Sequence, residues 1–165
     1  MYFKNINFEN FFFIVCITDK GEIYSFGCNN EGQLGLGDNE NYHSAPTQIQ
    51  TLKQFKITDI CCGKFFFYYN FIFFLFINDN KIGAFHSIAV SESGVVYIWG
   101  AGSSGQLGLG DYQSRNTPTL IKMLGNIFSI TGKRVQSVSA GSSHSACILG
   151  GEVYLWGNNS YGQIG

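Results

Sequence analysis

The chain has 165 residues, of which 45% are hydrophobic and 13% are charged, and its net charge is −1. That length can bury a sizeable core, and the apolar content excludes wholesale disorder. The sparse charge forms no basic patch, so the sequence carries no electrostatic signal for binding nucleic acid.

The N-terminal residues give no sign of export. One lysine, one glutamate and three asparagines precede a short apolar run at residues 11–17, and no small-residue cleavage site follows. The five cysteines include no CxxC pair, which argues against a metal site and fits thiols in a reducing compartment. We therefore expect an intracellular protein, cytoplasmic or nuclear, with no membrane span, metal or cofactor.

Short strands and turns follow one another along the first third of the chain. Residues 11–17 are apolar, residues 18–21 have turn chemistry, and residues 22–26 alternate like a half-buried strand. A glycine-rich loop at 27–37 and a polar loop at 38–44 come next. Residues 45–49 are expected to form an edge strand, because Pro46 cannot donate to a ladder. Residues 57–62 form another short apolar strand.

The same order returns later in the chain. Residues 85–90 are expected to pair with 95–99 across a turn at 91–94, and a second glycine-rich loop follows at 100–110. Strands are expected at 117–121 and 135–140. Residues 141–149 begin the third copy, and residues 152–157 lead into a third glycine-rich loop at 157–165. No helical periodicity is apparent. Four short strands per copy predict an all-β repeat protein, either a propeller or a solenoid.

One segment interrupts the period. Gly27 and Gly100 are 73 residues apart, whereas Gly100 and Gly157 are 57 apart, and the excess lies between Gly63 and Ala84. Joining those two residues removes residues 64–83, restores a Gly-x-x-His-Ser pattern and shortens the first spacing to 53. The segment is rich in Phe, Tyr, Ile and Asn, and its ends can encode splice sites. We therefore interpret residues 64–83 as an unspliced, in-frame intron. Its 13-residue apolar run is too short to span a bilayer, and a true loop insertion would be polar.

These motifs resemble the RCC1 (regulator of chromosome condensation) repeat family. The resemblance rests on Tyr-x-Trp/Phe-Gly, Gly-Gln-Leu-Gly-Leu-Gly-Asp, the following x-x-Pro and Cys/Ala-Gly-x-x-His-Ser, and it covers residues 17–63 and 84–165. It implies a β-propeller with seven four-stranded blades. The first copy would span 17–63, the second 84–140 and the start of a third 141–165, after a poorly matched segment at 1–16. The remaining blades would be missing from this chain.

The recurring residues are expected to be structural. The formal GxGxxG at residues 100–105 is not followed by a helical pattern, so turn chemistry is favoured over a dinucleotide site. Neither His-Ser pair has a partnered acid, which favours buried imidazoles over a hydrolase. The tryptophans are expected to pack in the core, Asp38 and Asp111 to cap turns, and His43 to be solvated. The structural repeat residues are Gly27, Gly32, Gly35, Gly37, Gly63, His86, Trp99, Gly100, Gly105, Gly108, Gly110, Gly141, His144, Trp156 and Gly157.

No catalytic constellation emerges from these residues. The resemblance implies a non-catalytic protein–protein interaction scaffold or regulatory module. The alternative is a guanine-nucleotide exchange factor for a Ran-like small GTPase, although no insertion here corresponds to the protruding wedge that exchange requires. A third reading is a regulatory propeller attached to an enzyme such as a kinase or ubiquitin ligase. The expected partners are proteins, with a small GTPase as one candidate.

Overall fold

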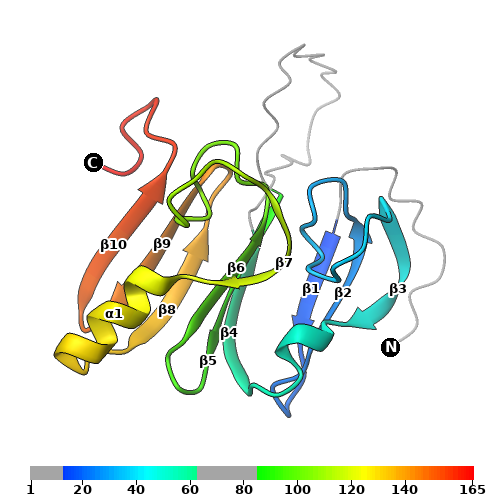
Figure 1. Ribbon diagram of the computed structural model, residues 1–165, viewed down its shortest axis with the longest axis horizontal. Coiled ribbons are helices and arrows are strands. Elements are labelled where there is room, and N and C mark those ends of the chain that lie inside the picture. The colour runs from blue at the N-terminus through cyan, green and yellow to red at the C-terminus, as the bar shows by residue number, and fades with distance from the viewer. Residues whose placement is uncertain (1–12, 63–84) are drawn as a thin grey trace, which may run out of the picture.

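The computed structural model describes residues 13–62 and 85–165 (Figure 1). Gly63, Ala84 and the suspected intron at residues 64–83 lie outside the described residues, as do residues 1–12 of the poorly matched N-terminal segment. Within the described ranges, no helix is long and apolar enough to cross a membrane.

Three antiparallel sheets stand side by side (Figure 1). The first has the order β1-β2-β3, the second β4-β5-β6-β7 and the third β8-β9-β10. The strands are β1 (Phe13–Ile17), β2 (Ile23–Cys28), β3 (Tyr42–Gln48), β4 (Ile57–Cys62), β5 (His86–Ser91), β6 (Val96–Gly100), β7 (Arg115–Leu120), β8 (Val135–Ala140), β9 (His144–Leu149) and β10 (Glu152–Gly157). This mostly β arrangement confirms the predicted fold class, and β3, which contains Pro46, is an edge strand as expected.

Strand register shows which residues are equivalent in the three sheets. The partner of Gly100 is His86, that of Gly157 is His144, and that of Gly27 is Phe13. A phenylalanine therefore stands in the first sheet where the other two have histidine. Among the described residues, the first sheet has no counterpart of β4 and β8, and the third has no counterpart of β7.

A helix that the sequence analysis did not predict follows β7. Helix α1 (Lys122–Thr131) and the 3-10 turn η1 (Gln50–Leu52) begin at equivalent places, so the expectation of no helical structure was wrong. Leu124 is buried and Ile127 packs beside it against the core, one turn apart on the same helix face. Gly132 ends α1 in the left-handed conformation (φ 70°) and donates its N–H to the oxygen of Phe128 at 2.8 Å.

The hydrophobic core lies in two layers between neighbouring sheets. Each layer combines alternate strand residues whose side chains face the next sheet with residues from loops and from η1 or α1. The layer between the first and second sheets contains Ile23, Ile49, Leu52, Ile57, Ala89 and Trp99. The layer between the second and third contains Ile88, Val90, Val96, Ile98, Leu107, Ile121, Leu124, Val135, Val138, Ala140, Cys147 and Leu149.

Candidate functional site: the joints between sheets

A main-chain oxygen in the first glycine-rich loop joins the first sheet to the second. The oxygen of Gln33 accepts hydrogen bonds from Trp99 Nε1 at 2.9 Å and from Ser87 Oγ at 3.0 Å. All three residues are fully buried. The tryptophan at the end of β6 and the serine of β5 are thus held by one acceptor in the loop of the preceding sheet. We call this set of one main-chain oxygen, one tryptophan and one serine a joint.

The same joint occurs one repeat later. The oxygen of Gln106 accepts from Trp156 Nε1 at 2.8 Å and from Ser145 Oγ at 2.8 Å. Repetition of the donors, the acceptor and the distances shows that the joint is a property of the repeat. Buried donors of this kind require a partner.

The glutamine side chain explains why this residue type recurs. Its Oε1 atom turns back and accepts a main-chain N–H two residues earlier. The bonds are Glu31 N to Gln33 at 2.9 Å, Ser104 N to Gln106 at 2.8 Å and Tyr161 N to Gln163 at 2.8 Å. The side chain closes the loop locally, which leaves the main-chain oxygen available to the next sheet.

Two glycines make room for the tryptophans. Gly35 and Gly108 have φ of 70° and 62°, and a Cβ on either would lie 2.7 Å from the Nε1 atom of Trp99 or Trp156 respectively. Any side chain here would be strained and would also collide with the tryptophan ring. These glycines therefore serve close approach between sheets.

The other predicted glycines lie at strand ends and in the loops. Gly27, Gly100 and Gly157 end or nearly end equivalent strands with φ near 100°. A Cβ on Gly100 or Gly157 would meet the main chain of the neighbouring strand. Gly141 lies against the imidazole of His144.

The loop glycines differ between the two repeats. Gly32 and Gly37 contact Asn116 and Thr117 at the start of β7, on the next sheet. Their equivalents Gly105 and Gly110 have no such neighbour, since Gly110 has no atom within 4 Å of its would-be Cβ and Gly105 meets only the ring of Tyr112.

His86 completes the second joint and is electrically neutral. Its Nε2 atom lies 2.9 Å from Ser145 Oγ, whose own proton is donated to Gln106. Nε2 must therefore carry the imidazole proton and donate it, and Nδ1 is left unprotonated with no hydrogen-bond partner. Burial, assisted by His144, lowers the pKa of His86 to about 4.

This geometry does not suit nucleophilic catalysis. In a hydrolytic pair the serine hydroxyl donates to the imidazole, which then removes the proton. Here the hydroxyl of Ser145 donates away from His86, and both residues are fully buried. His144 is half-buried.

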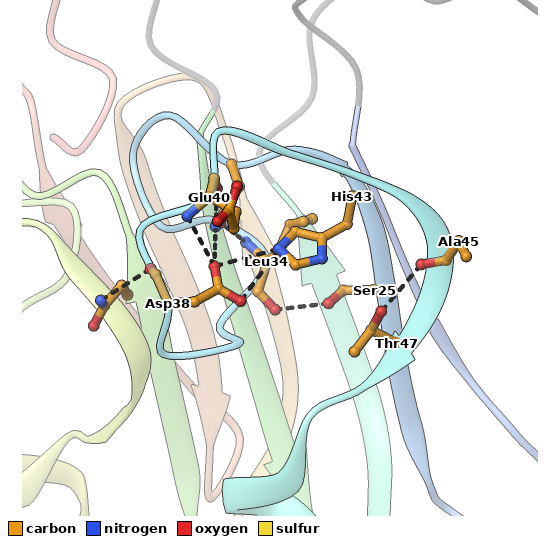
Figure 2. A network of polar contacts seen from close by, with 9 residues as sticks. Ser25, Leu34, Asp38, Glu40, His43, Ala45 and Thr47 are labelled. Atoms are coloured by element: carbon orange, nitrogen blue, oxygen red, sulfur yellow. Dashed lines mark hydrogen bonds and ion pairs between the residues drawn. The ribbon is translucent and has the colours of Figure 1, made fainter.

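A second polar network closes the first glycine-rich loop (Figure 2). Asp38 accepts from the N–H of Glu40 at 3.2 Å and from Asn29 Nδ2 at 3.3 Å, and its other oxygen lies 3.2 Å from His43 Nε2. His43, whose side chain is 20% exposed, is therefore paired with Asp38 and not solvated, contrary to expectation.

The equivalent aspartate in the second loop behaves in the same way. Asp111 accepts from the N–H of Gln113 at 3.0 Å and pairs with Arg115, and these contacts hold its pKa below the usual range. Both aspartates therefore stabilise turns, as predicted. Arg115 has the strand register of His43, opposite the glycine that ends the neighbouring strand.

The described residues contain no group of three potential metal ligands. The cysteines are free thiols. Burial raises the pKa of Cys62 to about 12 and that of Cys147 to about 11. These two thiols remain protonated near neutral pH, which suits packing better than chemistry.

Sequence reasoning missed the acceptors of the joints. The glutamines were visible in each repeat, but no sequence pattern shows that their main-chain oxygens receive the tryptophan and serine. It also missed Asp59 on β4, whose Oδ2 accepts from Ser137 Oγ at 3.1 Å and from the N–H of Val138 at 3.2 Å on the third sheet.

Comparison with known families agrees with this repeated construction. The model of the regulator of chromosome condensation (RCC1) repeat matches residues 20–68 and 93–148. The chain belongs to the RCC1-repeat family. The stretch between the two matches includes most of the segment that interrupts the period.

Curated RCC1-repeat relatives cover nearly all of this chain. It is 37% identical over 150 residues to the X-linked retinitis pigmentosa GTPase regulator of Canis lupus familiaris. The aligned region covers 90% of this chain and 12% of the relative. It is 32% identical to the probable E3 ubiquitin-protein ligase HERC6 of Homo sapiens, over 91% of this chain and 12% of the relative. It is also 32% identical to the ultraviolet-B receptor UVR8 of Arabidopsis thaliana, over 92% of this chain and 28% of the relative. The chain thus spans a small part of each.

Solved structures show the same fold. Human WBSCR16 superimposes with a TM-score of 0.63 at 25% identity, covering 88% of this chain and 30% of that one. Prp20p of Saccharomyces cerevisiae, the yeast RCC1 protein, gives a TM-score of 0.63 at 20% identity. The superposition covers 90% of this chain and 32% of Prp20p. The three sheets are therefore part of an RCC1-type β-propeller.

Proposed function

We propose that this chain is part of an RCC1-type propeller that acts in the cytoplasm or nucleus as a non-catalytic protein–protein interaction scaffold. One observation carries the proposal: the serine and histidine that resemble a catalytic pair are engaged in the hydrogen bonds that join neighbouring sheets. Ser145 donates to a main-chain oxygen, and His86 is buried, neutral and bonded to that serine.

The surface left for partners consists of the loop tips. One loop position holds a different residue in each copy, namely Glu31, Ser104 and Tyr161. The glutamine binds only the main-chain N–H at this position, so its side chain is free to vary. Tyr161 is 94% exposed, and Tyr112, near the end of the second loop, is 75% exposed. Exposed tyrosines on loops held by a rigid framework are favourable contacts for a protein partner.

Further blades are part of the proposal. Val153 on β10 is 64% exposed, whereas its equivalent on β6, Val96, is 2% exposed because the third sheet covers it. The exposed side chains of Ile148 and Leu155 extend the same apolar face. Another blade of the same repeat would cover this face as the third sheet covers the second.

The scaffold proposal is tested by separating loop tips from joints. Wild-type protein and the Tyr112→Ala and Tyr161→Ala variants are used as bait, and each captured protein is then titrated against each bait. We expect the loop-tip variants to lose a partner while their melting temperatures stay unchanged. Partners that bind both variants as well as wild type would contradict the proposal.

Regulation of a small GTPase is the second candidate, favoured by the 37% identity to a protein named as a GTPase regulator. The assay is release of a fluorescent guanine nucleotide from a panel of small GTPases, with and without the chain. Faster release that Tyr112→Ala abolishes would establish this candidate. Unchanged release across the panel would eliminate it and leave the scaffold function standing.

A further inference from the structure

The connection that carries α1 is longer than its equivalent in the first repeat and exposes apolar side chains. Residues 49–56 join β3 to β4, whereas residues 121–134 join β7 to β8. The shorter connection exposes polar residues such as Lys53 and Gln54. The longer one exposes Phe128, at 39%, and Ile130, at 84%. We call residues 128–134 the α1 tip.

The α1 tip lies beside two sheets that are both described. Arg134 lies against Gly94, in the turn between β5 and β6, and Lys133 lies against Gly150, in the turn between β9 and β10. The corresponding residues 53 and 54 of the first repeat are exposed although the second and third sheets are both in place. Exposure is therefore a property of this position in the repeat.

The polar groups at the end of α1 are already satisfied within the helix. Ser129 Oγ donates to the oxygen of Gly125 at 3.0 Å, and Thr131 Oγ1 donates to the oxygen of Ile127 at 2.7 Å. The left-handed cap described above satisfies a third carbonyl. The last carbonyls of a helix otherwise depend on water or on other partners. Because these groups are bonded internally, the α1 tip can leave water at a small desolvation cost.

Cations bracket an uncharged stretch at this place. Lys122 opens α1, Lys133 and Arg134 follow it, and residues 123–132 contain no charged side chain. The guanidinium of Arg134 lies 5.5 Å from the ring centre of Phe128. Lys133 pairs with Glu152, but both side chains are exposed, so the pair is weak and can exchange for another anion.

Charge also separates the two ends of the sheets. In Figure 1, α1 lies at the lower end of the third sheet, away from the glycine-rich loops at the top. The turns and connections at the lower end hold six of the seven lysines and arginines of the described residues, with four carboxylates. The loop end holds one arginine, Arg115, with Glu31, Asp38, Glu40 and Asp111. The α1 end is thus net positive and the loop end net negative.

We propose that the α1 tip is a peripheral contact with a lipid bilayer that contains anionic headgroups. Ile130 and Phe128 enter the interface between headgroups and acyl chains, and Lys133 and Arg134 lie at the level of the lipid phosphates. A protruding apolar tip with cations beside it suits a bilayer surface. The charge separation turns the α1 end toward an anionic surface and leaves the loop end facing away from it. This contact goes beyond the scaffold function, whose loop tips remain accessible.

The test uses the full chain and sedimentation with vesicles of phosphatidylcholine, with or without phosphatidylserine. We expect binding to the vesicles with phosphatidylserine, weakened by added salt, and little binding to phosphatidylcholine alone. Ile130→Ser should weaken binding at least about tenfold, because it removes an apolar side chain that enters the bilayer. Ile14→Ser is the matched control, since Ile14 is 45% exposed on β1 and Ser87 holds the same register position in the second sheet. It should leave vesicle binding unchanged.

A charge pair tests the electrostatic part of the contact. Arg134→Gln should weaken binding to phosphatidylserine vesicles about fivefold. Gln113→Glu changes the net charge by the same unit on an exposed residue of the loop end, and it should change binding little. Equal losses for these two variants, or equal binding to both kinds of vesicle, would overturn the proposal.

Insertion has a direct spectroscopic readout. With the spectrum of wild type subtracted, Ile130→Trp should shift its emission to shorter wavelengths on phosphatidylserine vesicles, whereas Ile14→Trp should not. An unshifted Ile130→Trp spectrum would refute insertion. Lipid-free dimers that Ile130→Ser abolishes, or a captured protein that Ile130→Ser loses without any vesicle binding, would assign the α1 tip to a protein contact and overturn the membrane proposal. The scaffold is judged separately by Tyr112→Ala at the loop end.

Discussion

Replacing Ser145 with alanine should destabilise the chain more than replacing the equivalent Ser87. Ser145 Oγ donates to the oxygen of Gln106 and accepts from His86 Nε2. Ser87 Oγ donates to the oxygen of Gln33, but the residue at the place of His86 in the first sheet is Phe13, which has nothing to donate. Apart from a weak contact of Ser87 Oγ with Cys62 Sγ at 3.7 Å, the two serines thus differ by one buried imidazole.

The difference can be estimated from the hydrogen bonds. Ser87→Ala removes the neutral bond to the Gln33 oxygen and a weak contact with Cys62 Sγ at 3.7 Å, about 1 kcal/mol in all, and Trp99 still satisfies the Gln33 oxygen. Ser145→Ala removes a similar bond and also leaves the buried Nε2–H of His86 without an acceptor, which costs about 1–3 kcal/mol more. For a chain of this size, we expect the melting temperature to fall by about 2–4 °C for Ser87→Ala and about 4–16 °C for Ser145→Ala.

Thermal unfolding by circular dichroism at pH 7.5 measures both losses. The double variant His86→Phe/Ser145→Ala supplies the control, because it removes the orphaned donor together with its acceptor, and the first sheet already carries Phe13 at this place. We expect it to be less destabilised than the sum of the single variants, with a coupling of about 1 kcal/mol or more. Equal losses for the two serines, or strictly additive losses in the cycle, would refute the joint as described.

Three further predictions follow from the same contacts. The pKa of His86 is lowered to about 4 from 6.5, so between these values the unfolded chain binds a proton that the folded chain does not. The free energy of unfolding should therefore fall by on the order of 3 kcal/mol as pH drops from about 6.5 to 4. Unfolding of wild type and of His86→Phe at pH 7 and 4.5 isolates this contribution, and an equal loss of stability in both proteins would contradict it. Gly35→Ala should cost about 2–4 kcal/mol in urea denaturation, because it combines positive φ with contact to Trp99, whereas Gly125→Ala, in helix α1 with open space around it, should stabilise slightly. Asp59→Ala should lower the free energy of unfolding in urea by about 2 kcal/mol, because it leaves Ser137 and the N–H of Val138 without their acceptor. Ser137→Ala keeps the bond to Val138 and should lower it by less, and equal losses would contradict a role for the Asp59–Val138 bond.

The strands were predictable because their signals are local. The apolar run at residues 57–62 coincides with β4, and Pro46 placed β3 at an edge, since both depend on residues adjacent in the chain. Helix α1 was missed because Gly125, Ser129 and Thr131 weaken its intrinsic helix propensity. Burial of Leu124 against strands of two sheets stabilises it, and that contact cannot be read from a short window.

The joints show a different limit of sequence reasoning. The repeat identified Trp99, Trp156 and both His-Ser pairs as recurring, but it did not show which atoms meet. Their common acceptor is a main-chain oxygen, an atom that every residue has, so no residue type marks it. What the sequence does mark is the glutamine that orients this oxygen and the glycine that admits the tryptophan.

The hairpin between β4 and β5 bears on the segment at residues 64–83. Cys62 is paired with Ser87, as Ala140 is paired with Ser145 in the third sheet. Four residues, 141–144, connect the latter pair, and joining Gly63 to Ala84 would connect the former by four residues as well, namely 63, 84, 85 and 86. The register of the described strands thus accommodates the shortened chain without adjustment.

We therefore expect mature transcripts to join the codons of Gly63 and Ala84, and the protein without residues 64–83 to unfold at the same or a higher temperature. Sequencing of full-length transcripts and melting of the two proteins measure these outcomes. Deleting residues 101–110 from the loop that carries Gln106 is the control for shortening the chain, and it should lower the melting temperature. Transcripts that retain the segment, together with a shortened protein that fails to fold, would show that the segment belongs to the repeat.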